Sequence, residues 1–217
     1  MSTATLLYKE SRLVLPAGYL LIVPLTLFNL IPHYPMIIGV AYVLPALFIA
    51  LSEANANRDL EFTVALPVRR DRVVLARHVM VAALQLVQVA ALAVVAVLIG
   101  AISPGGNIVG MDGNPAFFGF VLAAFGVFNA VFLPGYFASG HRMGKPAVLA
   151  GIAFFAVYGV CELVVALVPG VAAVLDTLDP AAAGPQVVVL AVGMVAYMAL
   201  TVLSYRMSVS RFARVDL

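Results

Sequence analysis

The sequence predicts an all-α integral membrane protein with six transmembrane helices and both termini in the cytoplasm. Of its 217 residues, 64% are hydrophobic and 10% are charged. Soluble domains carry about 25% charged residues, because water must solvate their surface. Long apolar stretches alternate with short polar segments, and the basic residues occur in every second segment. Together these observations indicate that lipid, rather than water, surrounds most of the chain.

Six stretches are apolar over roughly the 20 residues that a helix needs to cross a hydrocarbon core of about 30 Å. Among the Asp, Glu, Lys and Arg residues, only Arg77 and Glu162 fall inside them. Arg77 is close enough to one end for its side chain to snorkel to the headgroups. Backbone groups cannot face lipid unpaired, so each stretch is expected to be helical. The six spans are predicted over residues 13–31, 34–51, 73–102, 115–137, 147–168 and 186–205, in one transmembrane domain over residues 1–217.

The orientation follows from the basic residues, all of which lie on one side of this arrangement. The connections on the other side carry no charged residues except Asp112, Asp176 and Asp179. The positive-inside rule therefore places both termini in the cytoplasm of a multi-pass plasma membrane protein. The formal net charge of +2 is explained by topology and gives no indication of nucleic-acid binding. The twelve basic residues are Lys9, Arg12, Arg58, Arg69, Arg70, Arg72, Arg77, Arg142, Lys145, Arg206, Arg211 and Arg214.

Two flanking segments leave alternatives open. Residues 1–15 alternate apolar and charged side chains at helical spacing, which suits an interfacial helix or an early start of the first span. In the connection 169–185, the apolar run 171–175 is too short to cross the bilayer. This connection is either a re-entrant segment or an ordinary outer loop.

The segment 52–72 is the only sizeable cytoplasmic connection. Pro67 disfavours the helical region at Leu66 and is tolerated in a first helical turn, so two short helices are expected to meet there. The tip of this elbow combines apolar with basic side chains, which suits docking onto a protein surface. Alternatively, its arginines only anchor the next span at the headgroups. About 20 residues cannot close a catalytic core, so any energy source must lie in a partner.

The run from Asp59 to Arg77 resembles the loop between spans two and three in membrane permeases of type-2 ABC transporters, the exporter class that includes small bacterial peptide exporters. That loop commonly reads Ser-Leu-Pro-Val-Ser-Arg, followed by a hydrophobic run with a Lys. This sequence keeps Leu-Pro-Val at 66–68 and a basic residue at Arg70, whereas Ala65 and Arg69 replace the serines and Arg77 replaces the Lys. The family's interfacial N-terminal helix, coupling helix and partly re-entrant segment match the expectations above.

The resemblance implies a permease without a cofactor of its own. It would work as a dimer with a second copy or a paralogue, and with ABC ATPase subunits that bind ATP and Mg. Closure of the ATPase dimer would push the elbow and open a path between the two permeases. The residues that the resemblance assigns to ATPase coupling are Asp59, Leu66, Pro67, Val68, Arg69, Arg70, Arg72 and Arg77.

Polar side chains within the spans are candidates for a substrate pathway, because a buried polar group in lipid must face protein or water. Together with aromatic neighbours they suit an amphipathic substrate such as a peptide, a lipid-like molecule or a drug. The alternative is that they form interhelical hydrogen bonds. The candidates are Gln85, Gln88, Asn129, Tyr158 and Glu162.

Two other function classes are weaker. The substrate-binding subunit of vitamin-uptake systems has a similar size and topology, but lacks a coupling elbow centred on proline. An intramembrane enzyme needs a nucleophile or a metal-binding cluster, whereas His33, His78 and His141 are scattered and Cys161 is the single cysteine. No phosphate-binding loop is present, so the chain is not expected to be an enzyme or to bind a metal.

Overall fold

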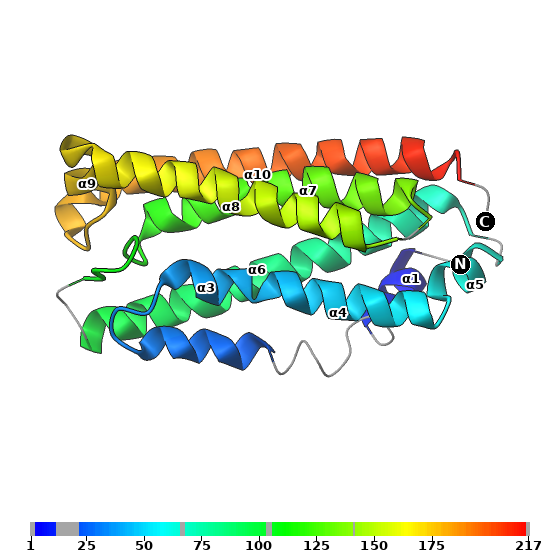
Figure 1. The fold of residues 1–217 in the computed structure, drawn as a ribbon, viewed down its shortest axis with the longest axis horizontal. Helices are drawn as coiled ribbons and strands as arrows, with labels where there is room; N and C mark the ends of the chain where they lie inside the picture. Colours follow the sequence, from blue (N-terminus) through cyan, green and yellow to red (C-terminus); the bar gives the residue numbers. More distant parts are fainter. Residues whose placement is uncertain (1–2, 12–21, 66–67, 103–105, 141, 216–217) are drawn as a thin grey trace.

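The computed structural model describes residues 3–11, 22–65, 68–102, 106–140 and 142–215, and the regular elements of this part of the chain are all helices, joined by turns and loops (Figure 1). The long helices run side by side along the long axis. The elements are α1 Thr3–Lys9, η2 Val23–Leu30, α3 Met36–Ala41, α4 Val43–Ala56, α5 Asp59–Ala65, α6 Arg70–Ile102, α7 Pro115–Ala138, α8 Gly144–Leu167, α9 Pro169–Leu175, η3 Pro180–Ala182 and α10 Ala183–Phe212.

Five helices of the described part are long and apolar enough to cross a membrane: Met36–Ala56, Arg70–Ile102, Pro115–Ala138, Gly144–Leu167 and Pro180–Phe212. They correspond to the second to sixth predicted spans, and several extend a few residues beyond the predicted ends. The first predicted span, 13–31, lies partly outside the described residues, and its described end is the 3-10 helix η2. Five of the six predicted spans therefore appear as long apolar helices.

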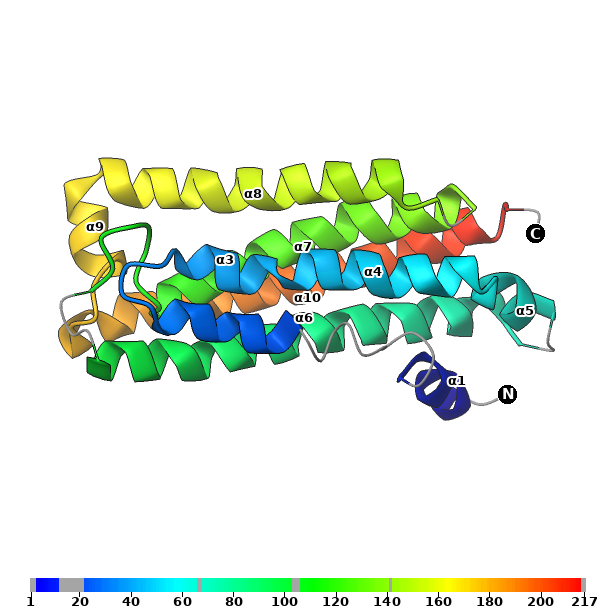
Figure 2. The same cartoon turned by 60° about the horizontal axis from the view of Figure 1, so that its bottom comes forward.

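The two ends of the bundle differ in charge. One end, which we call the basic end, carries α1, α5, the start of α6 and the C-terminal turn of α10 (Figure 1). The opposite end carries α9, a short helix that packs against both α8 and α10 (Figure 2). With seven residues, α9 is too short to cross a bilayer. This length agrees with both expectations for the connection 169–185, a re-entrant segment and an outer loop.

Helix α7 forms the centre of the C-terminal half, packed against α8 and α10. A Cβ atom added at Gly193 of α10 would overlap the carbonyl oxygen of Gly119 in α7. Only glycine allows the two backbones to approach this closely, as is common where membrane helices cross. Aromatic side chains of α7, including Phe125 and Phe132, are buried in the core.

Candidate coupling site

The segment between the second and third predicted spans forms a short helix, α5, at the basic end. A turn at Asn57 and Arg58 separates it from α4, and Arg58 has a positive φ of 49°. Leu66 and Pro67, the predicted tip of the elbow, lie outside the described residues. The structure therefore contains a helix where a coupling helix was expected, and the chain resumes at Val68 to enter α6.

Four charged side chains lie together where the α1 segment, α5 and α6 meet: Lys9, Glu10, Asp59 and Arg77. We call them the charge cluster. Lys9 Nζ lies 2.9 Å from Asp59 Oδ1 and 3.2 Å from Glu10 Oε1. Arg77 Nη2 lies 3.1 Å from Asp59 Oδ2, and Arg77 Nε lies 3.2 Å from Glu10 Oε2. Lys9 also donates a 2.9 Å hydrogen bond to the Thr63 hydroxyl. The cluster is thus a closed ring of alternating charges drawn from the α1 segment, α5 and α6.

Most side chains of this ring are buried, so its ion pairs affect how α1, α5 and α6 can move relative to one another. The side chains of Arg77 and Glu10 are only 0% and 2% exposed, and Asp59 is 9% exposed. A buried ion without a partner costs several kcal/mol, whereas a neutral set of paired ions offsets most of that cost. Since each cation contacts both acids, displacing α5 or α6 alone would remove one acid or one cation and leave an excess buried charge, and displacing the α1 segment would break two of the four ion pairs. The cluster therefore favours movement of α1, α5 and the start of α6 as one body.

The structure corrects the expectation that Arg77 snorkels to the headgroups. Its guanidinium is fully buried against Glu10 and Asp59 instead of reaching the surface. The physical reason is that α1 folds over the start of α6 and supplies the acid at position 10, so the guanidinium finds its counterions inside the protein. The described part of residues 1–15 forms α1, with Leu6 buried.

The arginines after the elbow have different surroundings. Arg69 is 72% exposed and pairs with Asp71, with Nη2 2.7 Å from Oδ2. Arg70 instead donates to the carbonyl oxygens of Phe212 and Val215, at 3.2 and 3.0 Å, and lies over the Phe212 ring. The last carbonyls of a helix have no partner within it, so Arg70 caps the C-terminal end of α10. Its charge is engaged within the chain.

Three further side chains near α5 and the start of α6 differ in their exposure. Arg72 is half-buried and has an interaction within the chain, and Val68 packs against the core. Phe62 on α5 is 67% exposed, although it is large and apolar. Phe62 was not among the residues predicted for the site. The helical repeat places it only part of a turn around α5 from Asp59 and Thr63, so the sequence pattern carried no clear signal of its exposure.

Within the spans, the predicted pathway amides bind one another. Gln85 and Asn129 exchange two hydrogen bonds of 2.8 and 3.0 Å, which join α6 to α7. Tyr197 and Thr201 of α10 extend this network, at 3.0 Å from Gln85 and 3.1 Å from Asn129. Gln88 donates separately to the carbonyl of Gly39 at 2.6 Å. These contacts are typical of interhelical hydrogen bonding, and a role in substrate passage stays a proposal.

Comparison with models of protein families identifies the family of the chain. A family model described as "ABC-2 family transporter protein" matches residues 5–213. The chain belongs to the ABC-2 transporter family. It is therefore the multi-pass membrane permease of an ABC transporter, a transport component that is not itself catalytic and that works with an ABC ATPase. Comparisons with curated proteins and with solved structures gave no match.

In this ABC-2 permease, the last two predicted site residues lie far along the bundle from the charge cluster. Tyr158 of α8 is buried and makes an edge-to-face contact with Phe117, with ring centroids 5.9 Å apart. Glu162, one turn further, is half-buried beside Gly110, where an added Cβ would lie 2.7 Å from Oε1. The structure thus places Glu162 against the loop that precedes α7, and separates it from Gln85 and Asn129.

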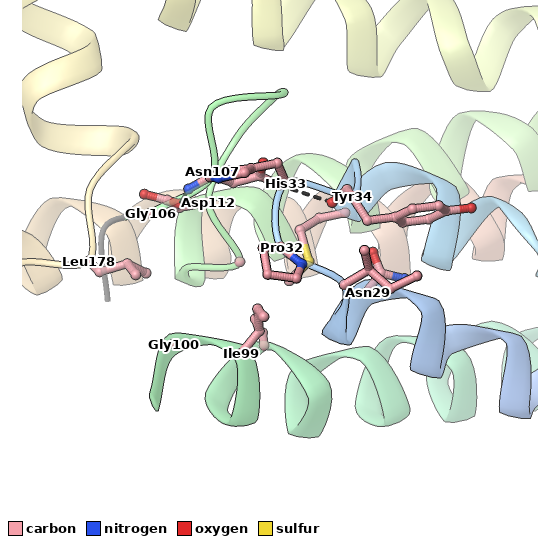
Figure 3. Close-up of a pocket in the computed structure, with 14 residues that line it drawn as sticks. Asn29, Pro32, His33, Tyr34, Ile99, Gly100, Gly106, Asn107, Asp112 and Leu178 are labelled. Atoms are coloured by element: carbon pink, nitrogen blue, oxygen red, sulfur yellow. Dashed lines mark hydrogen bonds between the residues drawn. The ribbon is translucent and has the colours of Figure 1, made fainter. Parts of the chain in front are cut away.

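A small cavity occurs at the same end of the permease (Figure 3). Its volume of about 30 Å³ is enough for one or two water molecules, and too small for an organic substrate. Asp112 lines it and accepts a hydrogen bond from the backbone of Asn107, whose side chain donates to Tyr34 O at 3.0 Å. Burial and the nearby Asp176 carboxylate raise the pKa of Asp112, although the Asn107 N–H opposes the shift. The described residues contain no group of His, Cys, Asp and Glu that could hold a metal.

Proposed function

We propose that the chain is the permease subunit of an ABC exporter, moving an amphipathic substrate with energy from a separate ATPase subunit. ATP and Mg would be bound by that ATPase alone. Family membership supports the permease role, and the charge cluster is the observation that carries the coupling mechanism. It ties the helix nearest to an incoming ATPase directly to a transmembrane helix.

In this mechanism α5 is the coupling helix. The ATPase would contact its exposed side, where Phe62 offers an apolar anchor and Arg69 a nearby positive charge. Such a pair suits a groove with apolar walls and an acidic rim. Arg70 has a supporting role, because it holds the end of α10 beside the start of α6.

Transmission would then follow the buried polar contacts. Closure of the ATPase dimer pushes α5, and the charge cluster carries that displacement into α1 and α6. Further along α6, the hydrogen bonds of Gln85 with Asn129 and Tyr197 would carry the displacement to α7 and α10. A second copy or a paralogue would form the other wall of the pathway, with both termini in the cytoplasm of the cell membrane.

The nature of the substrate is proposed from the spans. Their polar groups are amides and phenols in aromatic surroundings, including Asn129 and Tyr158. Such groups suit an amphipathic peptide, a lipid-like molecule or a drug better than a sugar or an inorganic ion. Helix movements that separate Gln85 from Asn129 would expose both amides to such a substrate.

Co-purification of the ATPase with tagged permease from native membranes tests docking. Phe62→Asp combined with Arg69→Glu should abolish ATPase recovery while the permease remains inserted, because both changes oppose an apolar, acidic surface. The matched control is Arg214→Glu, which reverses another exposed charge at the basic end. Equal recovery with wild type, docking variant and control would show that α5 is not the docking site.

A further inference from the structure

A second feature of the basic end lies away from α5. A groove of about 750 Å³ runs between α7, α8 and α10, within the size range of ligand sites. Ala130, Val131 and Gly135 of α7 form one side of it, and Leu149 of α8 lines another. Gly135 lets α8 approach, since an added Cβ would lie 3.1 Å from the Pro146 side chain. The groove is thus a feature of helix packing, with small side chains along α7.

Three cations line its mouth: Arg142 before α8, Lys145 in the first turn of α8, and Arg211 in the last turn of α10. All three are exposed, and no acidic residue lines the groove. Within the part of the chain that the structure describes, none of them has an ion pair. The Ser139 hydroxyl at the same mouth is engaged, with the carbonyls of Tyr136 and Arg142. The positive charges of these three side chains therefore favour an anionic ligand.

We propose that this groove binds one anionic phospholipid of the membrane leaflet at the basic end. Its phosphate would lie among Arg142, Lys145 and Arg211, and one acyl chain would lie along Ala130 and Val131. Basic pockets between transmembrane helices suit this ligand, because the cations sit at headgroup depth and the apolar wall continues into the hydrocarbon. A protein partner would have to cover an apolar wall that runs along lipid-facing helices, where Val148 and Ile152 are also exposed.

A lipid bound in the groove would stabilise the contact between the end of α10 and the start of α6. Arg211 directly precedes Phe212, whose carbonyl accepts from Arg70 at the start of α6. A lipid phosphate bound to Arg211 therefore reinforces the end of α10 at the point where the third predicted span begins.

Native mass spectrometry of the purified permease measures binding directly, with phosphatidylglycerol as the probe and phosphatidylcholine as the neutral lipid. The groove variant is Arg142→Gln, Lys145→Gln and Arg211→Gln together. Each cation near a membrane surface is worth about a fivefold change, so affinity for phosphatidylglycerol should fall on the order of 100-fold. The matched control removes the same charge elsewhere, through Arg58→Gln, Arg69→Gln and Arg206→Gln, and should retain most of the affinity.

A second variant separates a seated lipid from general attraction to charge. Ala130→Phe fills the groove and keeps all three cations, so it should also weaken phosphatidylglycerol binding. Excess inorganic phosphate should displace little lipid, because it lacks an acyl chain. Three results would each contradict the proposal: equal loss in groove variant and control, full affinity in Ala130→Phe, or complete displacement by phosphate. Cross-linking of Leu149→Cys to a second copy or to the ATPase in membranes would show that protein fills the groove instead.

Discussion

Asp59 of α5 and Arg77 of α6 form a buried ion pair, with Arg77 Nη2 3.1 Å from Asp59 Oδ2. The two residues are 18 positions apart and belong to helices on either side of the elbow. Their contact braces α5 against α6, because separating the two residues would break one of the two ion pairs that each of these buried side chains makes. The stability of the basic end is expected to depend on this pair.

Replacing Arg77 tests that dependence. Arg77→Met should lower the free energy of unfolding by about 3 to 5 kcal/mol, because it leaves Glu10 and Asp59 with a single cation between them. Arg77→Met combined with Glu10→Gln restores charge balance and should recover part of the loss. Arg69→Met, which removes an exposed pair, should cost about 0 to 1 kcal/mol. Thermal unfolding in detergent compares the three, and equal melting temperatures would refute the stabilising role of the charge cluster.

The glycine crossing gives a second prediction. Gly193→Ala places a Cβ against the Gly119 carbonyl, so α7 and α10 must move apart at a cost of about 1 to 3 kcal/mol. Gly159→Ala in α8 is the control, since no atom of another described element lies within 4 Å of the added Cβ. Its melting temperature should stay unchanged or rise slightly. The interpretation of a close crossing fails if both variants melt alike.

A third prediction concerns the amide network. Gln85→Leu removes the partner of Asn129 and of the Tyr197 hydroxyl, and should destabilise the permease by about 0.6 to 2 kcal/mol. In a double-mutant cycle with Asn129→Leu, the two changes should be strongly non-additive, because both break the same contact. Additive effects on the unfolding free energy would show that the two amides act independently.

Topology is tested by labelling. With Cys161 replaced by serine, cysteines introduced at Ile108 and Asp179 should react with an impermeant thiol reagent outside intact cells. A cysteine at Ala213 should react only after the membrane is opened, because it lies at the basic end. All three positions are exposed in the structure. External labelling at Ala213 would reverse the proposed orientation.

Much of the fold could be predicted from the sequence, because lipid imposes simple rules on length and charge. The second to sixth spans were found from apolar stretches alone, and α5 was expected from Pro67. Exact ends were harder, since polar residues such as Arg206 continue α10 beyond the apolar stretch without breaking the helix.

The candidate site was predicted less well. Asp59 and Arg77 were identified through the resemblance, but their mutual contact depends on how α1 and α5 fold onto α6. Sequence spacing carries no information about that packing, so Glu10 was seen only as part of an amphipathic pattern. Likewise, Arg70 gave no sign that it caps a helix 142 residues away.

The most direct test of the coupling mechanism measures distances between spin labels in the permease with its ATPase, with and without ATP. Labels at Ala65 of α5 and Val79 of α6 measure whether α5 and α6 keep their relative position. Labels at Ala65 and Val148 of α8 measure whether α5 moves relative to α8. All three side chains are exposed. We predict that ATP leaves the first distance unchanged and shifts the second, and that Asp59→Asn with Arg77→Met allows the first to change. A first distance that changes with ATP in the wild type, or a second that does not, would contradict the mechanism.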